Sequence, residues 1–266
     1  MKPSTLLRWV SFVPENDSTK TINQKTNKMK SLTTATVLIA VMAGAVSCKK
    51  EIIGEGPVTT QTRTVTNFTA IDLRMNGNVY YKNDPAWKLE ITAKESIHWM
   101  LETKVVDKKL VIQYNNGKTY DEDESIVINI SGPAVNRFEL NTSGSIYCMN
   151  DIQPADLYLR SSGSGNIYLH NVFTNSIEAE SIVSGRISVM GGAATNGKIE
   201  TDGSGKIDMT TLALRTATAR LIGSGDIKLK VAEQLNARID GSGSIYFSGY
   251  PLVISEISGT GRLIHY

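Results

Sequence analysis

Four tyrosines occupy the same position in a repeated turn-and-strand pattern. Each follows a glycine by three residues, where the alternation of a strand directs its side chain outward. They are Tyr80, Tyr147, Tyr168 and Tyr246. Aromatic rings on a flat sheet can stack on sugar faces or anchor a protein partner. Tyrosine also suits a half-exposed strand for structural reasons alone, so binding is a hypothesis beside a structural alternative.

Other residues with chemical potential lack the arrangement that catalysis or metal binding needs. The histidines His98, His170 and His265 are scattered, and the carboxylates at 121–124 form one charge run. General acid–base catalysis needs carboxyl groups in differently buried environments. There is no phosphate-binding loop. Calcium-binding repeats have a period of about nine and need an aspartate in every turn, whereas here only Asp202 and Asp240 precede a GSG turn. The sequence predicts no enzyme, no catalytic residue, no metal site and no cofactor.

The turns that position the tyrosines recur through half of the chain. Their second glycines are separated by 18 to 21 residues. They are Gly144, Gly165, Gly185, Gly205, Gly225, Gly243 and Gly261. An apolar residue follows each glycine by two positions, which indicates a strand packed on one side. We expect these glycines either to adopt a positive φ or to lie where a Cβ would strike the next coil.

This spacing predicts an all-β fold, a single-stranded β-helix-like solenoid of about 20-residue coils with GSG turns. Regular repeats occupy 134–266, and 64–133 begins the same stack irregularly and caps its first end, with a short helical turn within 94–104. Parallel, in-register stacking would set Lys206 beside Asp226 and Asp208 beside Lys228. The final strand exposes unpaired backbone. Arg262 and His265 blunt this edge, or it is a homo-oligomer contact through the terminal coil.

The N-terminal region reads as an export signal. Residues 1–28 are an extension that fits no signal, and we hypothesise that translation begins at Met29. Residues 29–47 form a signal peptide whose end, AVSC, resembles a lipobox, so Cys48 would carry lipid. A short membrane anchor, or a buried helix with an incidental cysteine, is the alternative. Residues 48–63 read as the lipid-anchored tether, and Cys148 as a buried apolar residue.

Charge narrows the possible partners. Without residues 1–47 the chain has 22 Lys/Arg and 24 Asp/Glu, so its net charge is about −2. No basic footprint for nucleic acid remains. Tethering through Cys48 would place the protein in the bacterial cell envelope, in the outer membrane, and leaves open whether it faces the periplasm or the exterior.

With the lipobox and the repeated turns established, the chain resembles the auto-transporter adhesins with a head GIN domain of Gram-negative bacteria. The resemblance covers residues 64–266 and rests on the GSG-type turns, from which Thr142, Val183 and Thr260 depart. It implies a right-handed β-helix, similar in shape to pectin lyases but without their catalytic residues, and a role in adhesion. It supplies no ligand motif.

The sequence therefore favours a non-catalytic envelope lipoprotein that binds a glycan or a surface protein through the solenoid faces. One alternative is an envelope scaffold that assembles through its open terminal coil. The other is a β-helix polysaccharide lyase or hydrolase, which would need a cleft with converging carboxylates and basic residues.

Overall fold

A computed structural model describes residues 54–115, 126–133 and 135–266, and strands dominate them. The chain divides into two units, 1–50 and 51–266, and every described residue belongs to the second. The extension, the signal peptide, Cys48 and the acidic run at 121–124 lie outside the described residues. The second unit is a β-solenoid of about six turns with roughly 20-residue coils, which confirms the predicted fold class. No helix in the described ranges is long and apolar enough to span a membrane.

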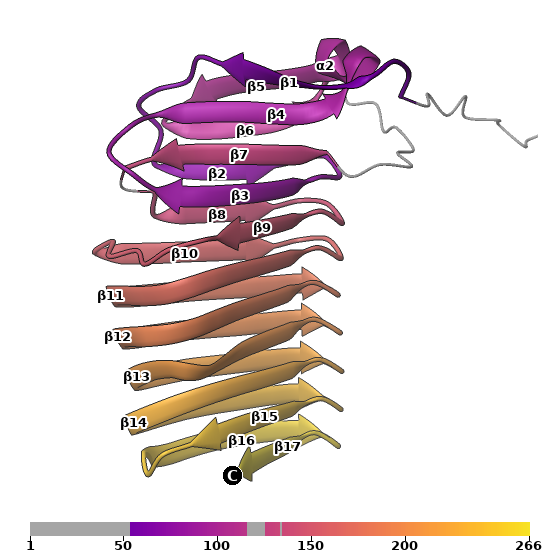
Figure 1. Ribbon diagram of the computed structural model, residues 1–266. Coiled ribbons are helices and arrows are strands. Elements are labelled where there is room, and N and C mark those ends of the chain that lie inside the picture. The colour runs from indigo at the N-terminus through magenta and orange to yellow at the C-terminus, as the bar shows by residue number, and fades with distance from the viewer. Residues whose placement is uncertain (1–53, 116–125, 134) are drawn as a thin grey trace, which may run out of the picture. The chain divides into compact units, whose positions relative to one another are not determined.

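The strands of the described ranges belong to one 17-stranded sheet (Figure 1). In chain order the elements are β1 (Val58–Arg63), β2 (Ala70–Leu73), β3 (Asn78–Asn83), β4 (Lys88–Lys94), α2 (Glu95–Met100), β5 (Leu101–Val106), β6 (Lys109–Tyr114), β7 (Val127–Gly132), β8 (Arg137–Leu140), β9 (Ser145–Cys148), β10 (Asp156–Ser161), β11 (Asn166–Val183), β12 (Arg186–Gly203), β13 (Lys206–Gly223), β14 (Asp226–Gly241), β15 (Ser244–Ser248), β16 (Leu252–Gly259) and β17 (Arg262–His265).

Each coil has two straight segments that lie on opposite sides of the core. In β11, residues 166–169 pair with the corresponding residues of β12, residues 171–174 pair through the bend, and residues 176–183 form the second long paired segment. The segments that follow the turns form what we call the outgoing face, which contains β1, β4, β7, β3, β9, the first parts of β11–β14, β15 and β17. The other segments form the return face, which contains β5, β6, β2, β8, β10, the second parts of β11–β14 and β16.

One apolar core runs between the two faces because alternate side chains of every segment point inward. Its central column is the isoleucine that follows each turn, and these side chains are buried. The column contains Ile146, Ile167, Ile187, Ile207, Ile227 and Ile245. Near the turns the core narrows, and the buried hydroxyls of Ser161 and Ser181 donate to the carbonyls of Gly165 and Gly185. The hydroxyls of these two serines are therefore satisfied, whereas the buried Thr201 hydroxyl at the equivalent position of β12 has no hydrogen-bond partner among the described residues.

The turn glycines are required for close approach between coils. The seven aligned glycines do not adopt a positive φ, so the first alternative from the sequence is wrong and the second is correct. A Cβ at Gly225 would overlap the carbonyl oxygen of Gly205. That oxygen accepts a hydrogen bond from the Asp226 N–H at 3.1 Å, so it cannot move away without loss of the ladder.

The first residue of several turns does adopt a positive φ, and Val183 is the one position where it is not glycine. Its φ is 80°, whereas glycine occupies the equivalent position at Gly203 and Gly223. A β-branched residue in this region is strained by about 1–3 kcal/mol. Because Val183 is 53% exposed, little apolar burial offsets that strain.

We therefore expect Val183→Gly to stabilise the protein by about 1 kcal/mol, after the greater backbone entropy of unfolded glycine is counted. Urea unfolding of the purified protein measures this change. Val183→Ala keeps a Cβ at the strained position and should gain much less. A lower midpoint for the glycine variant would show that Val183 is not strained.

The charged side chains lie in the predicted register. Lys206 pairs with Asp226, and Asp208 pairs with Lys228. The Lys206 Nζ lies 3.7 Å from the Asp226 Oδ2. Arg186 is placed beside Lys206, a like-charged neighbour that the sequence also shows. Such exposed pairs contribute at most about 1 kcal/mol each, so they support register more than stability.

The first end of the solenoid is not built in chain order. The row of β2 and β3 lies between the row of β6 and β7 and the row of β8 and β9. Beyond them, β4 pairs antiparallel with β7, and β5 pairs antiparallel with β6 (Figure 1). The expected helical turn is α2, and Arg63 donates to the carbonyls of His98 and Leu101 at 2.8 Å, which satisfies groups at the helix end.

One boundary from the sequence needs correction. Residues 58–63, assigned above to the tether, form β1 and pair antiparallel with β4. Four of these six residues are β-branched, namely Val58, Thr59, Thr60 and Thr62. Such residues favour strands, and the composition of the segment had suggested only a polar linker.

The last described coil leaves part of its inward side uncovered. Val253 is 36% exposed and Ile257 is 46% exposed, whereas the equivalent Leu235 and Ile239 of β14 are fully buried. Both β16 and β17 pair with a neighbouring strand on one side. This end presents an apolar surface and two strand edges.

Candidate binding surface

Three of the four tyrosines form a continuous stack on the outgoing face. The ring centroids of Tyr80 and Tyr147 are 5.1 Å apart with an interplanar angle of 11°, and those of Tyr147 and Tyr168 are 5.3 Å apart at 12°. We call these three residues the tyrosine ladder. Tyr246 lies in the same column but is separated from it by Ser188, Asp208 and Lys228.

Stacking within the tyrosine ladder determines which ring faces could contact a ligand. Both faces of the Tyr147 ring are covered by its neighbours, so this ring cannot stack on a sugar. The stack ends at Tyr80, whose next neighbour is Asn129, and at Tyr168, whose next neighbour is the small side chain of Ser188. The ladder is therefore a rigid support, and within the described residues no aromatic ring covers the outer face of either end ring. Its role in binding stays a prediction.

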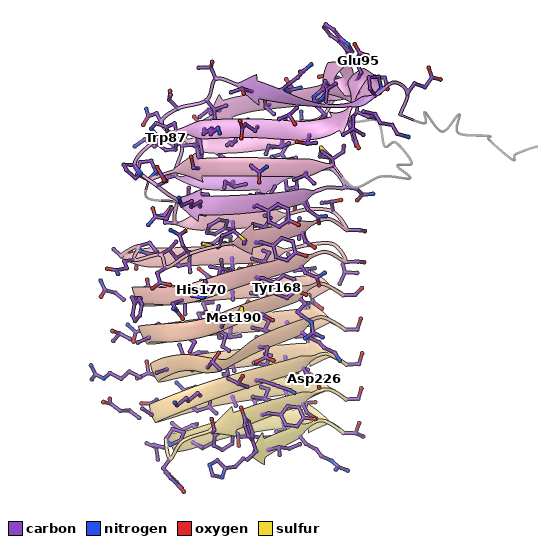
Figure 2. All side chains as sticks on the ribbon, viewed as in Figure 1. Trp87, Glu95, Tyr168, His170, Met190 and Asp226 are labelled. Carbon is purple, nitrogen blue, oxygen red and sulfur yellow. The ribbon has the colours of Figure 1, made fainter. Side chains whose placement is uncertain are left out.

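A hollow lies on the outgoing face beside Tyr80, and we call it the Trp87 hollow. Its apolar wall contains Tyr80, Trp87 and Met149, and its polar residues include Lys82, Lys88, Asp84, Glu90 and Asn129. It combines β3, β4 and β7 with the loop at 84–87 and with Met149, the residue after β9. Its volume of about 610 Å³ lies within the usual range of ligand pockets. Figure 2 labels Trp87, the last residue of this loop.

Packing and hydrogen bonds hold the Trp87 loop in place. The Trp87 ring lies 4.4 Å from the Phe68 ring, and a Cβ at Gly132 would collide with it. The Asp84 Oδ1 accepts the Ala86 N–H at 3.0 Å. This backbone hydrogen bond and the Lys82 ammonium lower the pKa of Asp84. The Ser131 hydroxyl donates to the Ala86 carbonyl at 2.8 Å, which ties the loop to β7.

Charges in the Trp87 hollow balance one another. The Lys82 Nζ lies 3.4 Å from Asp84, and the Lys88 Nζ lies 2.9 Å from Glu90. Each positive group thus has a negative partner two residues away on the same face. The hollow offers hydrogen-bond donors and acceptors without a net charge.

The return face has its own charged cluster, in which each carboxylate has a basic partner. Asp72 is fully buried and accepts hydrogen bonds from Arg74 and from the Asn141 amide. Burial raises the pKa of Glu139, but hydrogen bonds from Lys109 and Arg137 outweigh burial and lower it. A general acid needs a raised pKa, so this cluster is arranged as a structural ion network.

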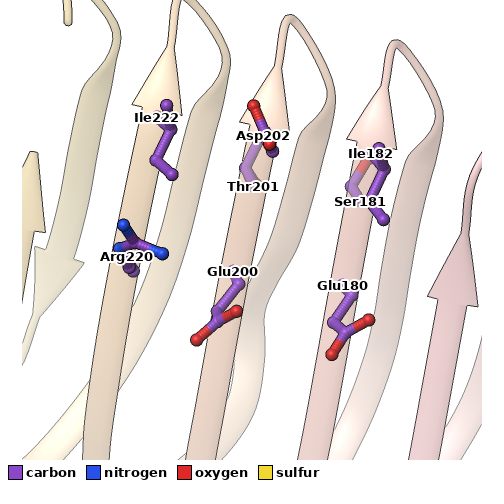
Figure 3. Close-up of a pocket in the computed structure, with 8 residues that line it drawn as sticks. All are labelled: Glu180, Ser181, Ile182, Glu200, Thr201, Asp202, Arg220 and Ile222. Carbon is purple, nitrogen blue, oxygen red and sulfur yellow. The ribbon is translucent and has the colours of Figure 1, made fainter. Parts of the chain in front are cut away.

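A second group of carboxylates lies farther along the return face (Figure 3). Glu180 and Glu200 project from neighbouring rows, with Asp202 closer to the turn and Arg220 on the next row. This hollow has a volume of about 160 Å³, below the usual size of ligand sites. Glu180 lies 3.6 Å from Arg160, and Glu200 lies 3.7 Å from Lys198. Within the described ranges, no group of three His, Cys, Asp or Glu side chains could hold a metal ion.

Cys148, His98 and His170, which the sequence also singled out, lie in surroundings that indicate structural roles. Cys148 is buried, its thiol donates to the Asn150 carbonyl at 3.3 Å, and burial raises its pKa to about 12. His98 is buried, and one ring nitrogen lies 3.0 Å from the Thr59 carbonyl. His170 is exposed and lies 2.8 Å from Asp151. The sequence missed Trp87 as a site residue, because a lone tryptophan before a strand carries no periodic signal.

The comparisons with known proteins agree with the fold. The family model described as "Putative auto-transporter adhesin, head GIN domain" matches residues 67–251. A solved putative adhesin from Bacteroides fragilis NCTC 9343 is 23% identical, with a TM-score of 0.76, and the match covers 81% of this chain and 100% of that one. A putative adhesin from Parabacteroides distasonis ATCC 8503 is 20% identical, with a TM-score of 0.68 and coverage of 82% and 100%.

A third solved structure, described as a putative lipid binding protein from Parabacteroides distasonis ATCC 8503, is 23% identical, with a TM-score of 0.67 and coverage of 82% and 100%. No curated protein matches the sequence. At these identities, the solved structures show that the solenoid is shared.

Proposed function

The chain belongs to the family of putative auto-transporter adhesins with a head GIN domain, and from this premise we propose that it is a non-catalytic binding protein of the cell envelope. The observation that carries the proposal is the tyrosine ladder beside the Trp87 hollow, both on the outgoing face. Strand pairing on both sides fixes the tyrosine ladder, and packing on Phe68 with the Ser131 hydrogen bond fixes the loop at 84–87, so little ordering cost opposes binding. The partner class is a glycan or a surface protein.

We further propose that the protein is tethered to the outer membrane by lipid on Cys48. The sequence AVSC at 45–48 supports this attachment. Five residues separate Cys48 from Gly54, where the described part begins. A segment of this length reaches at most about 20 Å, so lipid on Cys48 would hold the second unit close to the membrane surface.

The test is adhesion of intact cells to glycan-coated and protein-coated surfaces. We expect Tyr147→Ala with Tyr168→Ala to reduce adhesion at least about tenfold, because the double change removes the ladder that supports Tyr80. Tyr250→Ala is the matched control, since Tyr250 is 93% exposed and lies outside the ladder. Cys48→Ser should release the protein into the soluble fraction.

Exposure of Val253 and Ile257 favours a second candidate, an envelope scaffold that assembles through its terminal coil. Unchanged adhesion of the tyrosine double variant would contradict the binding role. Concentration-dependent self-association in sedimentation of the same variant would then support the scaffold.

A further inference from the structure

We propose that the Trp87 hollow binds a neutral polyhydroxylated ligand, a segment of uncharged glycan. This inference rests on the binding role proposed above and names the ligand class and the site. Aromatic ring faces, balanced charges and a prebuilt loop point to it independently.

The first observation is that one ring face of Tyr80 has no aromatic neighbour within the described residues. Tyr147 covers one face of this ring, and Asn129 of β7 lies on the opposite side. Tyr80 and Asn129 both line the Trp87 hollow, so the side of the Tyr80 ring that faces Asn129 borders the same space. The electron-rich face of an aromatic ring attracts the weakly positive C–H side of a pyranose. Tyr80 and Trp87 together supply such surfaces.

The second observation is the polar lining. Lys82 and Lys88 donate hydrogen bonds, Asp84 and Glu90 accept them, and the Asn129 amide does both. A sugar hydroxyl also donates and accepts, so it can bridge these groups without disruption of an ion pair. A charged ligand would have to compete with the Lys82–Asp84 and Lys88–Glu90 pairs. The hollow therefore matches an uncharged polyol better than an anion or a cation.

The third observation is that the site is built before a ligand arrives. Stacking on Tyr147 orients Tyr80, packing on Phe68 orients Trp87, and Ser131 holds the loop between them. Met149 is 57% exposed at the rim and adds apolar surface that water covers poorly. A preorganised site loses little conformational entropy on binding.

The experiment applies the purified protein to an array of neutral and acidic oligosaccharides, and then titrates it with chitotetraose, cellotetraose and the neutral oligosaccharides that the array identifies. We expect neutral glycans to bind, with a change in tryptophan fluorescence, and sialylated or sulfated ones to bind at least about tenfold more weakly. Trp87→Ala should weaken binding of the neutral glycan at least about tenfold.

Two further variants make the result specific. Met149→Arg introduces a charge at the rim from an exposed position, so it should block binding while thermal unfolding stays unchanged. Trp99→Ala is the matched control, because Trp99 is 78% exposed on α2 and does not line the hollow. It should bind like the unchanged protein.

Preferential binding of acidic glycans, or neutral glycan binding that survives both Trp87→Ala and Met149→Arg, would overturn the inference. So would adhesion that depends on the tyrosine ladder when the array shows no neutral glycan. In that last case the proposed binding role would stand, with a protein as the partner. Loss of the binding role itself would appear as unchanged adhesion of the ladder variant.

Discussion

Gly225→Ala is expected to lower the free energy of unfolding by about 3 kcal/mol, at the upper end of overpacking effects. The added methyl would overlap the Gly205 carbonyl oxygen, and Thr201 Cγ2 lies 2.8 Å from the same point. Neither can retreat cheaply, because Gly205 belongs to the hydrogen-bonded turn and Thr201 is buried. For a unit of this size, the thermal midpoint should fall by roughly 10 °C.

Ser224→Ala tests whether the effect belongs to the glycine rather than to the turn in general. Ser224 is exposed in the same turn, so its change should stay within about 0.5 kcal/mol. Chemical denaturation followed by circular dichroism measures both variants. A Gly225→Ala protein as stable as Ser224→Ala would mean that the coils do not approach each other as closely as described.

Phe138→Ala is expected to cost about 3–5 kcal/mol, the usual loss for a buried phenylalanine. Phe138 is fully buried in β8, and its ring meets the ring of Tyr81 edge-on at 5.5 Å. Because β8 pairs with both β2 and β10, this side chain lies where the irregular first end joins the regular repeats. The cavity should weaken both parts together.

Denaturant unfolding of the variant gives a second observable. In a repeat architecture, contacts pass mainly between neighbouring rows, so a weak junction can separate one transition into two. The matched control is Val106→Ala, because Val106 is 47% exposed at the end of β5. A Phe138→Ala protein that loses no more stability than this control would contradict the continuous core.

Local periodicity explains why much of the solenoid is predictable. The recurrence of an isoleucine two residues after a glycine fixes both the turn and the inward face of a strand. A nearly constant coil length of 18 to 21 residues then sets the register beside the turns, as the neighbours Lys206 and Asp226 show. Each of these relations repeats between adjacent coils, so a single sequence contains several copies of the same signal.

The first end of the solenoid and the Trp87 hollow depend on contacts that do not recur along the chain. Such contacts leave no periodic signal in the sequence. The row of β2 and β3 accepts β6 and β7 on one side, although the chain visits β4 and β5 before it returns. Trp87 belongs to the site because it packs on Phe68 and over Gly132, which are distant in sequence. Spacing placed the tyrosines in one column, but only the coordinates show that three rings cover one another.

The sequence also did not show which residue of each turn needs a positive φ. The spacing singled out the second glycine of each turn and left open whether it needs a positive φ or a close approach to the next coil. The structure gives the positive φ to the first position, as at Gly203, and a Cβ at either position would strike the preceding coil. Val183 shows that the first position can hold another residue at the cost of strain. At Gly225, in the second position, the Gly205 carbonyl oxygen leaves no room for a Cβ.

The most direct measurement of the binding role compares the two faces of the solenoid in one adhesion assay. Cells would display Tyr147→Ala with Tyr168→Ala on the outgoing face, or Glu180→Gln with Glu200→Gln on the return face. Adhesion should fall at least about tenfold for the first pair and stay at the unchanged protein's level for the second. If adhesion falls only for the glutamine pair, or falls for neither pair, the assignment of binding to the outgoing face is contradicted.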